Sequence, residues 1–214
     1  EVKQFISLLN KEKNKQMALL LKLAVTTGMR RGELLALEWD DLDFSNNTIT
    51  INKSLSYTTG KGYQIREPKT ENSIRTISVS INLMNELKKN KLIKNTDRIE
   101  AKELWKDGKY FFVFSSEFGK PLFPSVPSRY LRRFLERTNF KKVRFHDLRH
   151  THASMLFALN VHPKIVQERL GHSSLQTTLD RYSHMIPNMQ EAVAKSLEVE
   201  FKKHTEKSTK TSTS

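Results

Sequence analysis

The spacing of apolar and polar residues predicts a mainly helical chain. Residues 17–26 are apolar on every side, which is typical of a buried helix, and Gly28 is expected to end it. Pro163 and Gly171 occupy the first-turn and C-terminal capping positions of another predicted helix. The helices expected from such signals lie within residues 1–15 and at 17–26, 31–37, 124–134, 146–159, 163–170, 175–182 and 188–201, with further helical signals from residue 81 onward.

Strand signals are confined to a smaller part of the chain. A turn signal at residues 46–47 precedes a β-branched run, and residues 59–62 favour a hairpin connection. Residues 110–114 are apolar and fit either one more short strand or a buried connection. The predicted fold class is α+β, mainly α-helical with a small antiparallel three-stranded sheet, whose expected strands are 48–51, 63–66 and 75–79.

Composition narrows the class of protein. The 214 residues include 12 Phe and 2 Trp, which is enough for a sizeable core, so wholesale disorder is excluded. The absence of Cys excludes disulfides, a thiolate nucleophile and Cys-ligated metal sites. The chain lacks the apolar run of about 20 residues that crosses a bilayer, and it opens with Glu1-Val2-Lys3 instead of a signal peptide. We therefore expect a cytoplasmic protein without membrane partners, and the start at Glu1 favours a piece of a longer chain.

The net charge of +14 favours a polyanionic partner, for which nucleic acid is the first candidate. The charge is zoned, because residues 129–149 hold eight basic residues against Glu136 and Asp147, whereas residues 33–43 are acidic. The alternative is a basic protein whose charge serves solubility alone. The candidate DNA-binding residues of the basic segment are Arg129, Arg132, Arg133, Lys141, Lys142 and Arg144.

Three motifs contain candidate catalytic residues. In the first, residues 27–34, Arg30 follows the helix-breaking Gly28 and precedes Glu33 by three positions. A carboxylate at that spacing can hold an arginine in a buried site. The alternative is a surface helix start with an ordinary i,i+3 ion pair.

The second motif is residues 146–152, in which His146, Arg149 and His150 share one helix face. An arginine between imidazoles forms an anion pocket that includes a proton donor. His146 and His150 also have the i,i+4 spacing of a metal chelate, but the glutamate of hydrolytic zinc motifs is missing after His146. A third interpretation is that these histidines only pack and cap the helix start.

The third motif places His172 after Gly171 and Tyr182 ten residues further on. An isolated tyrosine is usually a core or interface residue. Its position after the other two motifs is what makes Tyr182 a candidate nucleophile.

The segments TGMRRGELLAL-W, PKTENSIRTI, HDLRHTHAS and LGHSSLQTTLDRYSH occur in this order over residues 26–184. The sequence thereby resembles the tyrosine recombinases, that is, the phage and conjugative-transposon integrases. The resemblance implies the catalytic-domain fold of that family and a catalytic set that needs no cofactor and no metal. Carried over position by position, this set is Arg30, Lys69, His146, Arg149, His172 and the nucleophile Tyr182.

The activity implied by the resemblance is site-specific recombination or integration of double-stranded DNA through a covalent 3′-phosphotyrosine, in a bacterial host cell or its nucleoid. A chromosome-dimer resolvase and a type IB-like topoisomerase use the same chemistry and stay open as alternatives. An alternative of another class is a DNA-binding or scaffold protein that kept the fold without the activity.

The resemblance also implies a domain organisation. Residues 1–201 are expected to form the catalytic domain, with the family's core-binding and arm-binding domains outside this fragment. Composition, and not the resemblance, predicts that 202–214 is a disordered basic Ser/Thr-rich tail. Met189, Val193 and Leu197 form an apolar stripe on the predicted helix 188–201. This stripe either packs on its own domain or docks onto a neighbouring protomer in a DNA-bound tetramer. DNA-bending and directionality proteins are further possible partners.

Overall fold

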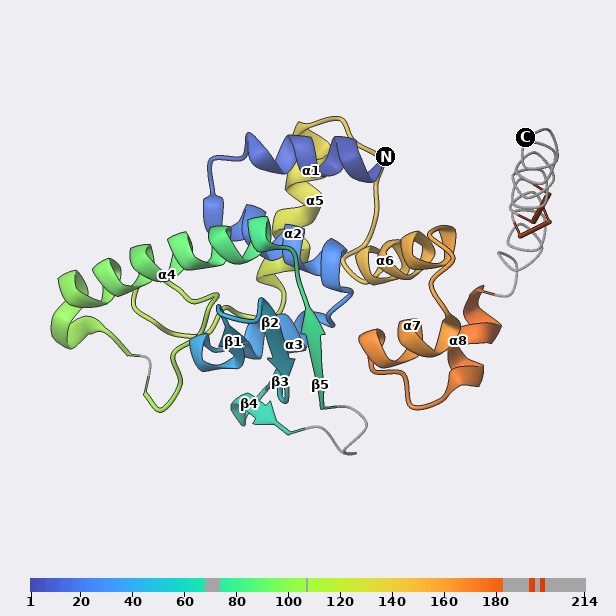
Figure 1. Ribbon diagram of the computed structural model, residues 1–214. Helices are drawn as coiled ribbons and strands as arrows, with labels where there is room; N and C mark the ends of the chain where they lie inside the picture. Colours follow the sequence, from blue (N-terminus) through green and yellow to red (C-terminus); the bar gives the residue numbers. More distant parts are fainter. Residues whose placement is uncertain (68–73, 107, 183–192, 195–196, 199–214) are drawn as a thin grey trace, which may run out of the picture.

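The computed structural model describes residues 1–67, 74–106, 108–182, 193–194 and 197–198, apart from the side chains of residues 177, 181 and 182. Helices predominate, and a small β region lies below α2 in the view of Figure 1. The helices are α1 (Val2–Asn10), α2 (Lys15–Thr27), α3 (Arg31–Ala36), α4 (Ile81–Ala101), α5 (Val126–Arg137), α6 (Asp147–Ala158), α7 (Pro163–Leu170) and α8 (Leu175–Tyr182), with 3₁₀ turns at Trp39–Asp41 and Lys102–Leu104.

Helix α2 lies at the centre of the fold, in contact with α1, α3, α4, α5 and α6. Its leucines are fully buried, as the run of apolar residues predicted. Asn14 caps its start, because the side-chain oxygen accepts a hydrogen bond from the Met17 amide at 3.0 Å. Gly28 ends the helix in the left-handed region at φ 68°, where a Cβ atom would lie 2.7 Å from both His152 and Leu170. The chain therefore leaves α2 directly against α6 and α7.

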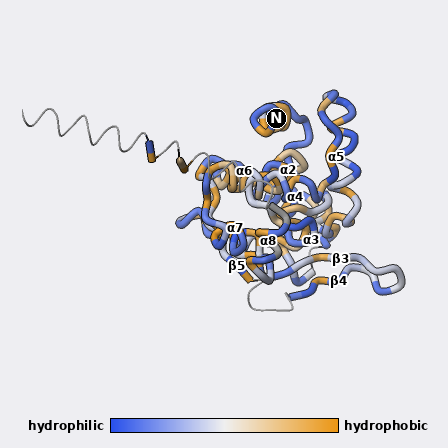
Figure 2. Tube along the Cα trace, turned by 90° about the vertical axis from the view of Figure 1, so that its right-hand side faces the viewer, coloured by the Kyte–Doolittle hydropathy of each residue, from blue (hydrophilic) through white to orange (hydrophobic). Residues whose placement is uncertain are grey.

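The β region consists of two antiparallel sheets. Strands β1 (Leu42–Asp43), β2 (Thr48–Ile51) and β5 (Arg75–Ser78) pair in the order β1-β2-β5, with Ile49 opposite Ile77 in the core. Strands β3 (Ser54–Thr58) and β4 (Gly62–Arg66) form a separate hairpin. β3 packs against α3, and the turn end of the hairpin projects away from the helices (Figure 2).

The predicted fold class is confirmed, but the strand pairing differs from the prediction in one respect. Residues 63–66 do not join the three-stranded sheet. They pair with β3, which the sequence analysis missed, and the third place is taken by the two-residue strand β1. A hairpin strand pairs with its neighbour across a short turn, so the turn at 59–62 was recognised correctly while its first strand was not.

The apolar segment 110–114 is a buried connection, which decides between the two alternatives. Phe112, Val113 and Phe114 are buried, and the Val113 amide donates to the Leu37 carbonyl at 2.8 Å. An isolated bridge joins Phe112 to Glu38.

The helices near the C-terminus follow the predicted positions. Helices α7 and α8 match the predicted ranges, and α5 and α6 differ from them only at their ends. Ala153, Phe157, Val166 and Leu170 form a second, smaller core between α6 and α7. Of the predicted helix 188–201 only residues 193–194 and 197–198 are described, and these are helical, while the predicted tail lies outside the described residues. In the described part, none of the helices combines the length and apolar character needed to span a membrane.

Candidate active site

Arg30 lies between α2 and α3 and is held by the carboxylate of Glu33. Its backbone amide donates to Glu33 Oε2 at 2.7 Å and its guanidinium donates to Oε1 at 2.8 Å. The Glu33 side chain is buried, whereas the Arg30 side chain is 44% exposed. The pair therefore has a buried carboxylate and a guanidinium that still faces solvent. This arrangement lies between a fully buried arginine and an ordinary surface ion pair, the two alternatives from the sequence.

Glu33 has a second, buried cationic partner that the sequence analysis missed. Arg75, the first residue of β5, donates from its two terminal nitrogens to Glu33 Oε2 at 2.7 Å and Oε1 at 3.2 Å. Burial alone would raise the pKa of the Glu33 carboxyl, but Arg75 and then Arg30 outweigh it and lower the pKa to about 2. Arg75 shares the buried face of its strand with Ile77, so the period of two contained a signal for a buried arginine.

Arg149 is buried at the start of α6 and bridges two other elements. It donates to the Gly28 carbonyl at 2.8 Å and to the Leu170 carbonyl at 2.6 Å. The end of α2 and the end of α7 are therefore both attached to this guanidinium.

Three arginines converge on the C-terminus of α7. Arg75 donates to the carbonyl of Arg169 at 2.9 Å, Arg149 to that of Leu170, and Arg30 to that of Gly171 at 3.0 Å. Carbonyls in the last turn of a helix lack intrahelical partners and form the negative end of the helix dipole. The sequence thus uses one helix end to place guanidinium groups from three distant segments.

His172 follows this helix end directly. Its ring is buried, and Nδ1 is 2.8 Å from the hydroxyl of Thr178 in α8. Tyr182 is the last residue of α8, one helical turn beyond Thr178. The backbone thereby places Tyr182 on the helix that contacts His172, although its side chain lies outside the described part.

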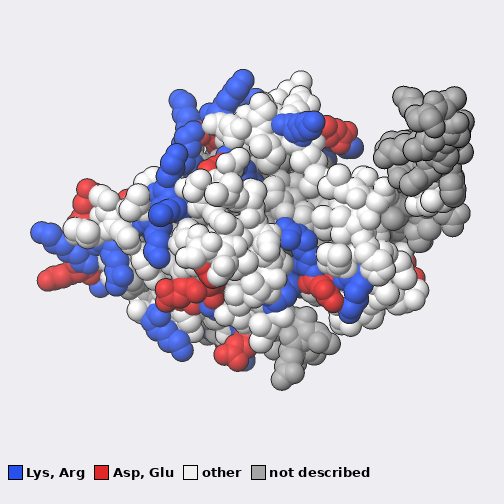
Figure 3. All heavy atoms as spheres, viewed as in Figure 1, with Lys and Arg blue, Asp and Glu red and all other residues white. Residues whose placement is uncertain are grey.

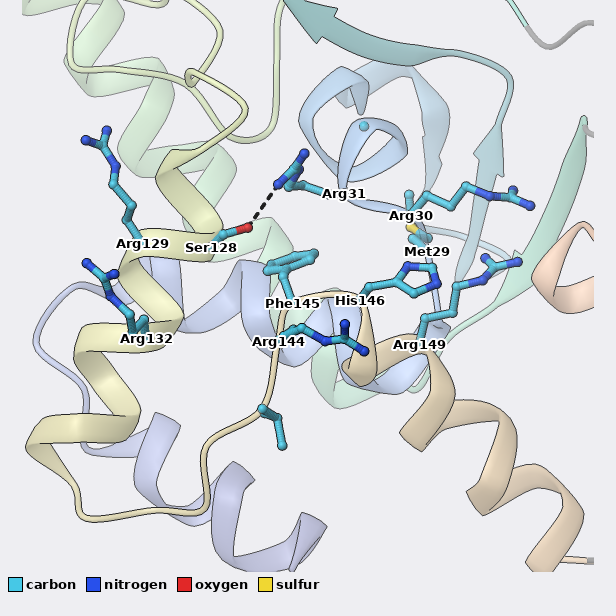
Figure 4. A pocket seen from close by; sticks show the side chains of 12 residues that line it. Met29, Arg30, Arg31, Ser128, Arg129, Arg132, Arg144, Phe145, His146 and Arg149 are labelled. Carbon is cyan, nitrogen blue, oxygen red and sulfur yellow. Dashed lines mark hydrogen bonds between the residues drawn. The ribbon is translucent and has the colours of Figure 1, made fainter. Parts of the chain in front are cut away.

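The other ionisable residues of the second motif lie beside Arg149. The rings of His146 and His150 meet edge to face with centroids 4.9 Å apart. His146 is exposed and lies along the same wall as Arg30 and Arg149 (Figure 4). His152 is buried instead, and its Nε2 accepts a hydrogen bond from Arg169 at 3.1 Å.

These residues open into a pocket of about 590 Å³, which we call the arginine pocket (Figure 4). Among the described residues its lining includes six arginines and His146, together with Ser128, and has no acidic side chain. Such a surface attracts an extended anion. The arginines of the pocket are Arg30, Arg31, Arg129, Arg132, Arg144 and Arg149.

The predicted DNA-binding residues divide into two groups. Arg129, Arg132 and Arg144 line the arginine pocket, and Arg144 also pairs with Asp147 at 3.0 Å. The remaining residues do not line it: Arg133 is exposed on α5, Lys141 lies 3.7 Å from Glu1, and Lys142 lines an adjoining hollow.

Known proteins show the same sequence pattern and fold. The family model described as the phage integrase family matches residues 1–208. This chain belongs to the phage integrase family. The ICEBs1 integrase of Bacillus subtilis (strain 168) is 33% identical over 202 residues, which cover 92% of this chain and 52% of that protein.

Further members of the phage integrase family have similar sequences and structures. A tyrosine recombinase XerC-like protein of Caldanaerobacter subterraneus subsp. tengcongensis is 33% identical over 184 residues, covering 82% of this chain and 47% of that protein. The Tn1549 transposon integrase, solved in complex with transposon right end DNA, superposes with a TM-score of 0.74 at 26% identity, covering 90% of this chain and 64% of that chain. The present chain spans about half the length of the curated relatives that it matches.

Four of the six residues implied by the resemblance have described side chains in this phage integrase family member. Arg30, Arg149 and His172 meet at the end of α7, and His146 shares the pocket with the two arginines. Tyr182 is described by its backbone alone, and Lys69 lies outside the described residues.

Proposed function

We propose that this chain is the catalytic domain of a site-specific tyrosine recombinase that cleaves and rejoins double-stranded DNA. The observation that carries the proposal is the arrangement of Arg30 and Arg149 at the end of α7, next to His172 and facing the arginine pocket. Membership of the phage integrase family and the DNA-bound Tn1549 integrase support the same conclusion.

In this proposal the arginine pocket binds the scissile phosphate. Arg30 and Arg149 present rigid forks that match phosphate oxygens and stay charged at any working pH. They and His172 stabilise the negative charge that accumulates on the pentacoordinate transition state. Fixed cations thereby do the work that divalent metal ions do in many other phosphoryl-transfer enzymes.

The attacking group is the phenol oxygen of Tyr182. A free phenol has a pKa near 10, so only about one molecule in a thousand is ionised at pH 7 and a base has to accept its proton. We assign this role to His146 or to the field of the arginines. The tyrosine oxygen forms a bond to phosphorus as the bond to the 5′-oxygen breaks, and Lys69 protonates the departing 5′-oxygen.

The second half of the reaction reverses the first with another DNA end. A 5′-hydroxyl attacks the 3′-phosphotyrosine, the phosphodiester forms again and the tyrosine is released with its proton restored. The phosphotyrosine conserves the bond energy, so rejoining needs no ATP and no cofactor.

The partners and the domain organisation belong to the same proposal. Residues 1–201 form the catalytic domain and residues 202–214 a basic tail, and the helix 188–201 docks onto the next protomer in a tetramer on DNA. The XerH recombinase, 25% identical to this chain, was solved on a palindromic difH substrate in a post-cleavage complex, which supports DNA cleavage by a related fold. DNA-bending or directionality proteins complete the assembly.

The test is Tyr182→Phe on a nicked suicide duplex that carries the DNA flanking the gene for this chain. The parent is expected to form a covalent adduct on a denaturing gel, in buffer with EDTA, and the variant none. DNA affinity should stay within about two-fold, because the change removes one oxygen and no positive charge.

Tyr130→Phe is the matched control. Burial and the Glu12 carboxylate raise the pKa of Tyr130 to about 12, which makes this phenol a poorer nucleophile. The control should react like the parent. An adduct formed by Tyr182→Phe would disprove the assignment of the nucleophile, and a parent that binds DNA without reacting would favour the scaffold alternative. A parent that relaxes supercoils but never joins two duplexes would favour the topoisomerase alternative.

A further inference from the structure

Arg75 connects two parts of the proposed catalytic site without lining the pocket itself. Its side chain is 6% exposed and forms a two-pronged ion pair with Glu33, the residue that holds Arg30. A third nitrogen donates to the carbonyl of Arg169, three residues before His172. One guanidinium is thus bonded to both the Arg30 support and the helix end that leads to His172.

The connection between β5 and α7 is reciprocal. The Arg75 side chain binds the backbone of Arg169, and the Arg169 side chain donates to the Ser78 carbonyl at the end of β5 at 3.0 Å. Arg169 also donates to the Thr26 carbonyl of α2 at 3.4 Å. These bonds fix the position of β5 relative to α7.

The close packing at Gly171 leaves little freedom for this guanidinium. A Cβ atom on Gly171 would lie 2.8 Å from a terminal nitrogen of Arg75 and 3.1 Å from its central carbon. Gly171 has a φ of 65°, and its carbonyl accepts the hydrogen bond from Arg30. Arg30 is therefore bonded to Gly171, and Arg75 occupies the space where a side chain at this position would lie.

We propose that Arg75 is a positioning residue for DNA cleavage, which sets the orientation of Arg30 through Glu33 and the position of His172 through the end of α7. The inference rests on the proposed function. Arg75 touches neither DNA nor the reacting atoms, so it acts on the rate of the chemical step and not on DNA affinity.

Lysine cannot replace Arg75 in this role. The planar guanidinium directs donors to two carboxylate oxygens and a carbonyl at fixed angles, whereas an ammonium is a single point of charge on a flexible stem. Misplacing a catalytic group by about 1 Å can lower a rate by about 10²-fold.

The first experiment compares Arg75→Lys with the parent, both as full chains. We measure the rate of covalent-adduct formation at saturating protein, the Kd for DNA and the melting temperature. The expected result is a rate lower by about 10²-fold with a Kd within about three-fold of the parent. A rate equal to that of the parent, or a loss confined to Kd, would overturn the proposal.

The matched control is Lys53→Met, at a partly buried cation that also forms ion pairs. Lys53 lies 2.8 Å from Glu38 and 2.9 Å from Asp41 and lies outside the proposed catalytic machinery. Its loss is expected to lower the melting temperature while the adduct rate stays near that of the parent. A similar rate loss in both variants would reduce Arg75 to a general structural role.

A double-mutant cycle with Arg30→Lys separates positioning from stability. If Arg75 acts in part through Arg30, adding Arg75→Lys to Arg30→Lys lowers the rate less than it does in the parent, because the path through Glu33 has no arginine left to orient and only the path to His172 remains. Additive effects would contradict this path. Should Arg75→Lys fail to fold, Glu33→Gln tests the same path. We expect the same loss of rate and the same non-additivity with Arg30→Lys. A Glu33→Gln rate equal to that of the parent would overturn the proposal. A parent without any adduct would instead disprove the proposed function, and this inference with it.

Discussion

The guanidinium groups of the site depend on the protein for their orientation as much as on their charge. Hydrogen bonds to charged groups contribute about 1.5–3 kcal/mol each, so the bonds to the end of α7 are enough to hold an arginine in one rotamer. Arg30 has five N–H groups. In the described part its guanidinium uses one nitrogen on Glu33 and the other terminal nitrogen on Gly171, which leaves donors for a phosphate. The same side chain can therefore be fixed and still bind an anion.

This dependence predicts the outcome of charge-conserving substitutions. Arg149→Lys and Arg30→Lys should each lower the rate of adduct formation by about 10²–10³-fold, because removing one preorganised donor from such a site costs about that much. A lysine at 149 would also replace with a single nitrogen the two nitrogens that now donate separately to the Gly28 and Leu170 carbonyls. Single-turnover assays with Arg98→Lys, an exposed arginine of α4 outside the pocket, provide the control. Rates within a few-fold of the parent would show that the replaced arginine is no phosphate clamp.

The sequence indicated most of the site residues but not the long-range contacts that hold them in place. The spacing of Arg30 and Glu33 predicted an i,i+3 contact, and the contact is present. The link between Glu33 and Arg75 spans 42 positions and that between Arg75 and Arg169 spans 94, so no local pattern could indicate either of them. Only the burial of Ile77 two positions away marked Arg75 as unusual.

At the scale of elements, local signals located the helices well because caps and periodicity act within a few residues. Gly28 ends α2, and Pro163 and Gly171 bound α7, as expected, while the cap at Asn14 is an addition from the structure. Strand pairing depends on distant contacts instead. The pairing of β2 with β5 leaves the intervening chain free to form its own hairpin. The alternation Ser-Leu-Ser-Tyr in β3 is itself a strand pattern, but it spans only four residues and was overlooked.

The junction of α2, α6 and α7 contains a buried histidine that makes its stability depend on pH. Burial and then the charge of Arg169 lower the pKa of His152 to about 4, from an ordinary value of 6.5. The ring is neutral in the folded protein at pH 7 and accepts the Arg169 hydrogen bond in that form. Between pH 6.5 and 4 the unfolded chain binds one proton more than the folded chain, so stability falls as the pH falls.

His152→Gln tests this junction. The parent should lose about 1 kcal/mol of unfolding free energy per pH unit from this residue between pH 6.5 and 4, and the variant should lack this contribution. Urea titrations at pH 7, 6 and 5 measure the difference in slope, which is insensitive to any constant loss from the substitution. Equal slopes in parent and variant would show that His152 is protonated without cost in the folded state.

At the scale of the whole molecule, the net charge of +14 is not all directed at one partner surface. Lys and Arg gather over α4 in Figure 3, on residues that do not line the arginine pocket. Helix α5 contributes Arg129 and Arg132 to the pocket. We therefore expect that only part of the basic surface releases counterions when DNA binds.

The salt dependence of DNA binding measures that part. The DNA association constant K falls as salt rises, and each phosphate of duplex DNA that the protein neutralises makes the slope of log K against log salt concentration steeper by about 0.9. The double variant Arg129→Gln/Arg132→Gln should bind more weakly and reduce the slope by about 1.8 if each arginine neutralises one phosphate. Lys88→Gln/Lys89→Gln on α4 removes the same charge away from the pocket and should leave the slope unchanged. Fluorescence anisotropy between about 50 and 200 mM salt measures the slope for the parent and for both double variants. If both double variants change the slope equally, DNA senses the total charge of the molecule, and the arginine pocket is not its binding surface.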